Sequence, residues 1–189
     1  MFNSLFAQIE VMKVLLSSET QKMKPFSFAG VGFTPQVFPI LVNMIKDSKI
    51  KVEFDSKQSG RAEYDYATNT LFLGFTSAQT LSRKALIIHE SIHAIYDVAA
   101  QKMTVADSES IAYIAQCQFA RANNPNPEQR LKSPDAAKDK VFELAWSIAG
   151  KILAGEKPTS SEKTELSSAV SQHPFYMANS AHDAGFNGV

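Results

Sequence analysis

The chain has 189 residues, 44% of them hydrophobic and 20% charged, a composition typical of a soluble globular protein rather than a disordered or fibrous one. Nineteen basic residues balance nineteen acidic ones, so the excess positive charge typical of a nucleic-acid-binding protein is absent. The single cysteine, Cys117, excludes an intramolecular disulfide bond and fits a reducing compartment. We therefore expect one domain, residues 1–189, that binds neither DNA nor RNA.

Residues 2–16 carry apolar side chains at intervals of three and four, which predicts an amphipathic surface or docking helix. Gln8, Glu10 and Lys13 interrupt the apolar run and no basic segment precedes it, so a signal peptide is not expected. No apolar run approaches the eighteen or so residues of a membrane span. The sequence therefore predicts a cytoplasmic protein, with signal-independent export as the alternative, and leaves the oligomeric state open.

The middle of the chain predicts a small sheet. The aromatic and Gly-containing stretch 26–33 is expected to be a loop, and Thr34-Pro35 to start a helix that ends near Lys46. Three segments with alternating or β-branched side chains follow at 50–55, 62–66 and 71–74. Because their connections are too short for helical crossovers, we expect antiparallel pairing.

The rest of the chain predicts helices. They are expected at about 76–102, 107–122, 133–154 and 160–170, with an irregular tail over 172–189. The fold class is therefore α+β. Its core lies at about 50–120, preceded by N-terminal helices at 2–46 and followed by C-terminal helices at 134–170.

The motif His89-Glu90-Ser91-Ile92-His93 lies within the first of these long helices. Two histidines four residues apart project from one face of a helix and can bind a single cation. Glu90 lies about 100° around the helix from His89, where it can face a bound water molecule as a general base. The motif therefore predicts a metal site with a base beside it.

A hydrolytic zinc ion needs three protein ligands and one open position. The third histidine of metzincins is missing, because Tyr96 and Ala99 stand where that extension has its Gly and His. An antiparallel helix after the motif could instead bring back Glu109, sixteen residues beyond His93, with Asp107 as the alternative ligand.

These residues resemble the gluzincin metallopeptidases, the thermolysin-like group with His-Glu-x-x-His and a glutamate on a following helix. Ala94 and Asp97 match thermolysin as well, whereas Tyr113 stands where it has an acidic residue, which makes Asp97 the candidate to orient a zinc-bound histidine. The resemblance covers about 50–120. It implies a zincin-like fold, with a small antiparallel sheet on the metal helix and the strand at 71–74 lining the cleft.

The resemblance also implies Zn²⁺ held by His89, His93 and Glu109, and hydrolysis of a peptide or protein substrate. Peptidases of this kind often stabilise the oxyanion with a His or Tyr. The candidates are His173, Tyr176 and His182, with Tyr96 and Tyr113 as further possibilities. Two alternatives remain open: a non-catalytic zinc-binding interaction or regulatory domain, and a zinc amidase acting on a non-peptide or cell-wall substrate.

Overall fold

The computed structural model describes residues 2–189 and divides them into two compact units. Unit 1 comprises the residues up to Gln21 together with Pro35–Gln101 and Gly185–Val189, and unit 2 comprises Lys22–Thr34 and Lys102–Ala184. The expectation of one domain stays a prediction. Within the described residues the chain forms six α-helices and two small sheets, which confirms the α+β class.

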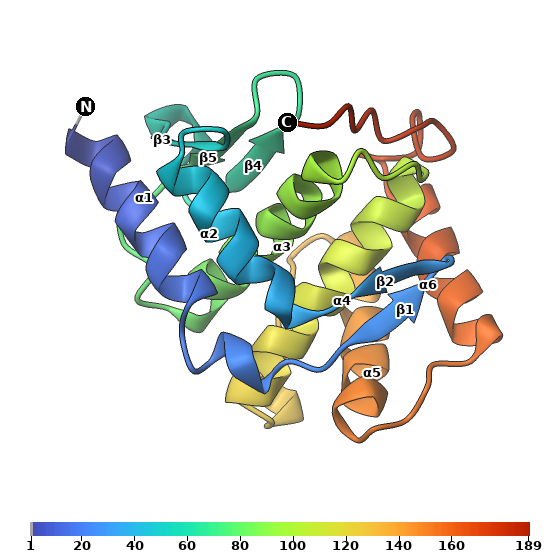
Figure 1. Cartoon of the computed structure of the whole chain (residues 1–189). Helices are drawn as coiled ribbons and strands as arrows, with labels where there is room; N and C mark the ends of the chain where they lie inside the picture. Colours follow the sequence, from blue (N-terminus) through green and yellow to red (C-terminus); the bar gives the residue numbers. More distant parts are fainter. Residues whose placement is uncertain (1) are drawn as a thin grey trace. The chain divides into compact units, whose positions relative to one another are not determined.

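Unit 1 contains three α-helices. They are α1 (Phe2–Leu15), α2 (Phe38–Lys46) and α3 (Leu81–Val98), and α1 packs beside α2 (Figure 1). The predicted end of α2 is confirmed, but its start is not, because Pro35–Val37 forms the 3-10 turn η2 instead. Pro39 then lies in the first turn of α2, where a missing N–H costs no helical hydrogen bond.

The helix that carries the motif is shorter than expected at both ends. Thr80, rather than Thr76-Ser77, caps α3, since its Oγ1 accepts a hydrogen bond from the N–H of Arg83 at 3.3 Å. The helix ends at Val98, and Ala100 follows with a positive φ of 46°, a conformation that cannot continue a right-handed helix. The motif therefore lies in the middle of α3.

The main sheet contains β3 (Lys51–Phe54), β4 (Ala62–Asp65) and β5 (Thr70–Leu73), in the order β3-β5-β4. The strands β4 and β5 are antiparallel, but β3 and β5 are parallel, so the prediction of an antiparallel sheet is wrong for that pair. A short turn joins β4 to β5, and β3 pairs with the other edge of β5. The chain between β3 and β5 consists of η3 (Ser56–Gln58) and β4, so this parallel pair needs no α-helical crossover. The sheet packs on α3 through β4 and β5.

Unit 2 begins with a β-hairpin where a loop was expected. The strands β1 (Phe26–Phe28) and β2 (Val31–Phe33) are antiparallel, with the rings of Phe26 and Phe33 5.1 Å apart. Ala29 and Gly30 connect them with φ of 49° and 79°, the positive values that suit a two-residue hairpin turn. The expectation of a loop was wrong because Ala-Gly lacks the Asn-Gly or Asp-Gly signal of such turns.

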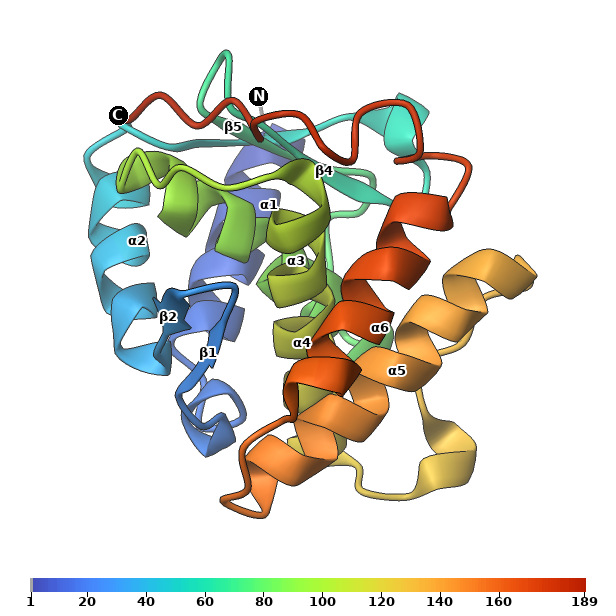
Figure 2. The same cartoon turned by 90° about the vertical axis from the view of Figure 1, so that its right-hand side faces the viewer.

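Three helices form the rest of unit 2. They are α4 (Val105–Asn123), α5 (Ala136–Leu153) and α6 (Ser160–Gln172), which pack side by side (Figure 2). Thr104, Asp135 and Thr159 cap their N-termini, and Thr159 forms a capping box with Glu162. Short 3-10 turns η1 (Thr20–Lys22) and η4 (Pro127–Gln129) complete the elements. Over residues 2–189, no helix combines the length and apolarity needed to cross a bilayer.

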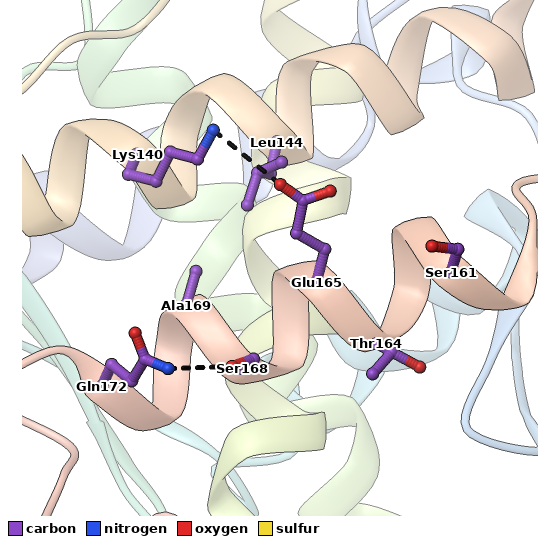
Figure 3. A pocket seen from close by; sticks show the side chains of 8 residues that line it. All are labelled: Lys140, Leu144, Ser161, Thr164, Glu165, Ser168, Ala169 and Gln172. Atoms are coloured by element: carbon purple, nitrogen blue, oxygen red, sulfur yellow. Dashed lines mark hydrogen bonds and ion pairs between the residues drawn. The ribbon is translucent and has the colours of Figure 1, made fainter.

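A shallow groove of about 680 Å³ runs between α5 and α6 (Figure 3). Lys140 of α5 forms an ion pair with Glu165 of α6 across it, with 3.9 Å between Nζ and Oε1. Short polar side chains such as Ser161 and Ser168 line the rest. The groove is open and contains no residue of the predicted metal site.

Candidate metal centre

The two histidines of the motif lie on one face of α3, one turn apart. Their ring centroids are 5.1 Å apart and their planes are inclined by 71°. His89 is buried and His93 is half-buried, while the fully buried Ile88 and Ile92 fix the helix in the core of the protein. The predicted geometry of two imidazoles that project together from one helix is therefore present.

Glu90, the predicted base, is held by the sheet. Its Oε2 accepts a hydrogen bond from the backbone N–H of Tyr64 in β4, at 3.0 Å and in a buried environment. β4 is an edge strand of its sheet, so alternate N–H groups point away from β5, and the Tyr64 N–H that donates to Glu90 is one of these. The sequence gives no signal for this contact, since Tyr64 lies 26 residues before Glu90 and belongs to no motif.

The position of the sheet corrects another expectation. The segment 71–74 was expected to line the cleft, but β5 is the central strand, with partners on both of its sides. A central strand has no unpaired backbone groups to offer a substrate. The strand that reaches the motif from the sheet edge is β4, through Tyr64.

Asp97 is fully buried one turn beyond His93. Its Oδ2 accepts a hydrogen bond from the Tyr64 hydroxyl at 2.7 Å, and its Oδ1 accepts one from the backbone N–H of Asn187 at 2.9 Å. The side-chain amide of Asn69, oriented to satisfy its neighbours, donates to Oδ2 at 3.1 Å. Asp97 therefore joins the sheet and the C-terminal tail to α3, and its expected role of orienting a histidine stays a prediction.

Burial raises the pKa of the Tyr64 hydroxyl well above its usual value, and the hydrogen bond to Asp97 and the negative charge of that residue raise it further. The phenol therefore stays protonated near neutral pH and donates to the carboxylate. Tyr64 thus holds α3 at two points, through its backbone at Glu90 and through its side chain at Asp97.

Phe186, in the C-terminal segment of unit 1, covers His93. The centroids of the two rings are 6.4 Å apart, and Phe186 also meets Tyr66 edge to face at 6.5 Å. Gly185 makes this approach possible, because its φ is 85° and a Cβ atom there would lie 2.7 Å from the Tyr66 ring. Sequence reasoning missed Phe186, since nothing in a tail residue indicates which helix it will cover.

Glu109, the predicted third ligand, lies in unit 2 at the start of the second turn of α4. The first turn is capped by Thr104. Its hydroxyl oxygen accepts a hydrogen bond from the Asp107 N–H at 3.1 Å, and the hydroxyl donates one to the Asp107 carboxylate at 2.9 Å. The carbonyl oxygens of His182 and Ser180 accept the first two N–H groups of this helix, those of Val105 and Ala106. Asp107 therefore takes part in capping the helix.

Tyr176, one of the oxyanion candidates, lies beside Glu109 in unit 2. Burial raises the pKa of Tyr176 far above its usual value, and the negative charge of Glu109 raises it further. The hydroxyl oxygen of Tyr176 lies 3.2 Å from that of Tyr113, another candidate. One cluster therefore contains Glu109, Tyr113 and Tyr176. No sequence motif could predict it, because 63 residues separate the two tyrosines.

The remaining candidates lie elsewhere. The ring of His173 is 5.4 Å from that of Tyr176, and its Nε2 lies 3.7 Å from Oδ1 of Asp135. The side chain of His182 is exposed, and its backbone carbonyl contributes to the α4 cap. Tyr96 is buried in α3, which raises the pKa of its hydroxyl. The roles of these residues at an oxyanion stay predictions.

His89, His93 and Glu109 form a group that could hold a metal ion, with one ligand atom from each side chain. Two imidazoles and one carboxylate form a donor set that leaves coordination positions for water or substrate, and zinc is among the divalent metals that accept it. Comparison with known protein families, with curated proteins and with solved structures finds no match. Interpretation of the site therefore depends on its own chemistry.

Proposed function

We propose that this protein is a zinc-dependent peptidase of zincin-like fold, with His89, His93 and Glu109 as the metal ligands. The observation that carries the proposal is that these three side chains form a possible metal-binding group while Glu90, a carboxylate, directly follows the first ligand. Three protein ligands of these types are the set that hydrolytic zinc sites use, whereas structural zinc sites are closed by four. This favours catalysis over a purely structural role.

Zinc bound in this way would polarise the carbonyl of the substrate and lower the pKa of a water molecule toward neutrality. Glu90 would accept the proton of that water and deliver it to the nitrogen of the leaving amine. The hydrogen bond from Tyr64 to Oε2 supports this role, because it fixes the orientation of the carboxylate without neutralising its charge.

Tyr176 is the oxyanion donor that we favour over His173 and His182. It is the candidate that interacts with a proposed metal ligand, and its raised pKa keeps the hydroxyl proton available for donation. His173 would then orient the Tyr176 ring, on which it packs. The exposed side chain of His182 has the weakest support.

Peptides are the favoured substrates because β4 lies at a sheet edge and reaches Glu90 through its backbone. An extended peptide that adds to this edge, beside the Tyr64 N–H that Glu90 already occupies, would run past the proposed base. A zinc amidase that acts on a non-peptide or cell-wall substrate would share the metal and the base, so the substrate must be decided by assay.

The test combines metal analysis with peptide digestion. We expect the wild-type protein to bind one zinc ion, and Glu109→Ala to lose most of it, while the matched variant Asp107→Ala retains it. Glu90→Gln should keep zinc but lose roughly 10²–10⁴-fold in the rate of peptide-library digestion. Circular dichroism of each variant would verify folding.

Three results would contradict the proposal. Equal zinc content in wild type and Glu109→Ala would remove Glu109 from the ligand set. Unchanged digestion by Glu90→Gln would exclude it as the base. Zinc binding without digestion of any peptide would identify either an interaction domain or, if cell-wall material is cleaved instead, an amidase.

A further inference from the structure

Helix α1 has two apolar faces. At 100° per residue, Ala7, Val11 and Val14 point in one direction and are buried in unit 1. The apolar residues on the opposite side of the helix share another stripe: Phe2, Leu5, Phe6, Ile9, Met12 and Leu16. A surface helix has one apolar stripe, and a helix that is apolar on both sides is normally buried on both.

The outer stripe is not covered by unit 1. The exposed fractions are 79% for Phe2, 55% for Phe6, 51% for Leu5 and 50% for Leu16. These four large apolar side chains are at least half exposed, and the half-buried Ile9 and Met12 lie between them, so they form a stripe rather than the isolated apolar residues common on protein surfaces. A patch of this kind marks an interaction site.

The charges of α1 indicate the kind of partner. Its only charged residues, Glu10 and Lys13, pair with each other at 3.2 Å, and Glu10 also accepts the N–H of Ala78 at 2.9 Å. Helices that bind an anionic membrane surface carry several Lys or Arg residues beside the apolar face. By the same 100° spacing, the exposed Lys13 lies on the outer face, where its ion pair with Glu10 leaves no net charge. The face therefore suits an uncharged and largely apolar surface like itself, which the apolar stem of Lys13 can also contact.

We propose that this face is the interface of a homodimer, in which α1 pairs antiparallel with α1 of a second copy about a twofold axis near Ile9. In this arrangement Phe2 of one copy lies opposite Leu16 of the other, and Phe6 opposite Met12, so large side chains meet smaller ones. Opposite ends of the two helix dipoles also lie side by side. The inference is independent of the metal site.

The available area is sufficient for such a dimer. Phe2 and Phe6 alone expose about 270 Å² at their exposed fractions, taking roughly 200 Å² for each phenylalanine. With the leucines and the half-buried Ile9 and Met12, the face reaches about 500 Å² per chain and about 1,000 Å² for the pair, the lower limit for a specific interface. A reversible dimer is therefore expected.

The test measures mass in solution by sedimentation over a range of protein concentrations. We expect the wild type to reach twice the 20.8 kDa of one chain. Phe6→Glu should weaken the dimer at least a hundredfold, because two unpaired carboxylates would be placed in the interface. The control Phe175→Glu changes a phenylalanine in unit 2 that is more exposed than Phe6, 80% against 55%, and should leave the mass unchanged.

A cross-link tests the geometry. Because Cys117 is buried, Ile9→Cys would be the accessible thiol, and it should form a disulfide-linked dimer under mild oxidation if the twofold axis lies near this residue. A monomeric wild type at all concentrations, or a dimer that Phe6→Glu does not weaken, would overturn the proposal. Binding of the monomer to lipid vesicles through α1 would overturn it in favour of a membrane surface.

Discussion

Replacement of Asp97 by Asn tests how the sheet and the tail are joined to the metal-binding helix. The carboxylate is fully buried, and three donors converge on its two oxygens: the Tyr64 hydroxyl and the Asn69 amide on Oδ2, and the Asn187 N–H on Oδ1. Asparagine has the same shape but a single acceptor oxygen. If that oxygen keeps the Asn187 N–H, the new NH₂ group faces the other two donors.

The expected cost follows from the two hydrogen bonds lost. Each bond to a charged acceptor contributes about 1.5–3 kcal/mol, so Asp97→Asn should lower the free energy of unfolding by about 4 kcal/mol. For a chain of this size, 1 kcal/mol corresponds to about 2–4 °C in Tm, so the expected decrease is about 10 °C. That is a large share of the ~5–15 kcal/mol that stabilises a typical domain.

The assay is thermal and urea unfolding followed by circular dichroism. Asp47→Asn, the same substitution at an exposed position after α2, is the matched control and should change the unfolding free energy by less than about 0.5 kcal/mol. If Asp97→Asn unfolded within about 2 °C of the wild type, the three donors would not depend on the carboxylate, and our account of how α3 is anchored would be wrong.

Three further predictions concern other parts of the fold. Thr159→Ala removes the capping box of α6 and should cost about 1 kcal/mol in urea unfolding; no measurable change would mean that the helix end finds another cap. Hydrogen bonds from Arg130 lower the pKa of Asp139 to about 2. The Asp139 carboxylate therefore contributes to stability above about pH 4, and this contribution is lost as the pH falls toward 2. Unfolding of Asp139→Asn should be less sensitive to pH in this window, and a pH profile equal to that of the wild type would contradict the ion pair. In Gly74→Ala the new Cβ would lie 2.6 Å from a backbone carbonyl carbon, which should lower the free energy of unfolding by about 1–3 kcal/mol. In the control Gly32→Ala the new Cβ would meet no atom within 4 Å, so its stability should be nearly that of the wild type. Equal stability of the two variants would refute the predicted clash.

Local patterns predicted the helical part of the fold well. Apolar periodicity placed the six α-helices of residues 2–189, although not every helix start, because backbone hydrogen bonds within a helix join residues only four apart. The ends of α3 were misplaced, since Thr76, Ser77 and Thr80 are all suitable caps and only the packed structure selects among them. The hairpin at 26–33 was missed because a positive φ at Ala29 is not visible in the residue type.

The sequence by itself determined the pairing of His89 and His93, because their spacing of four residues puts them on one helix face wherever that helix lies. It could propose Glu109 as a partner in the ligand group only as one of two acidic candidates. The tertiary structure decided that β4 and not β5 is the strand that holds Glu90, and that the tail covers His93 through Phe186. These contacts join residues far apart in the chain, and their geometry depends on strand order and packing, which no local spacing encodes.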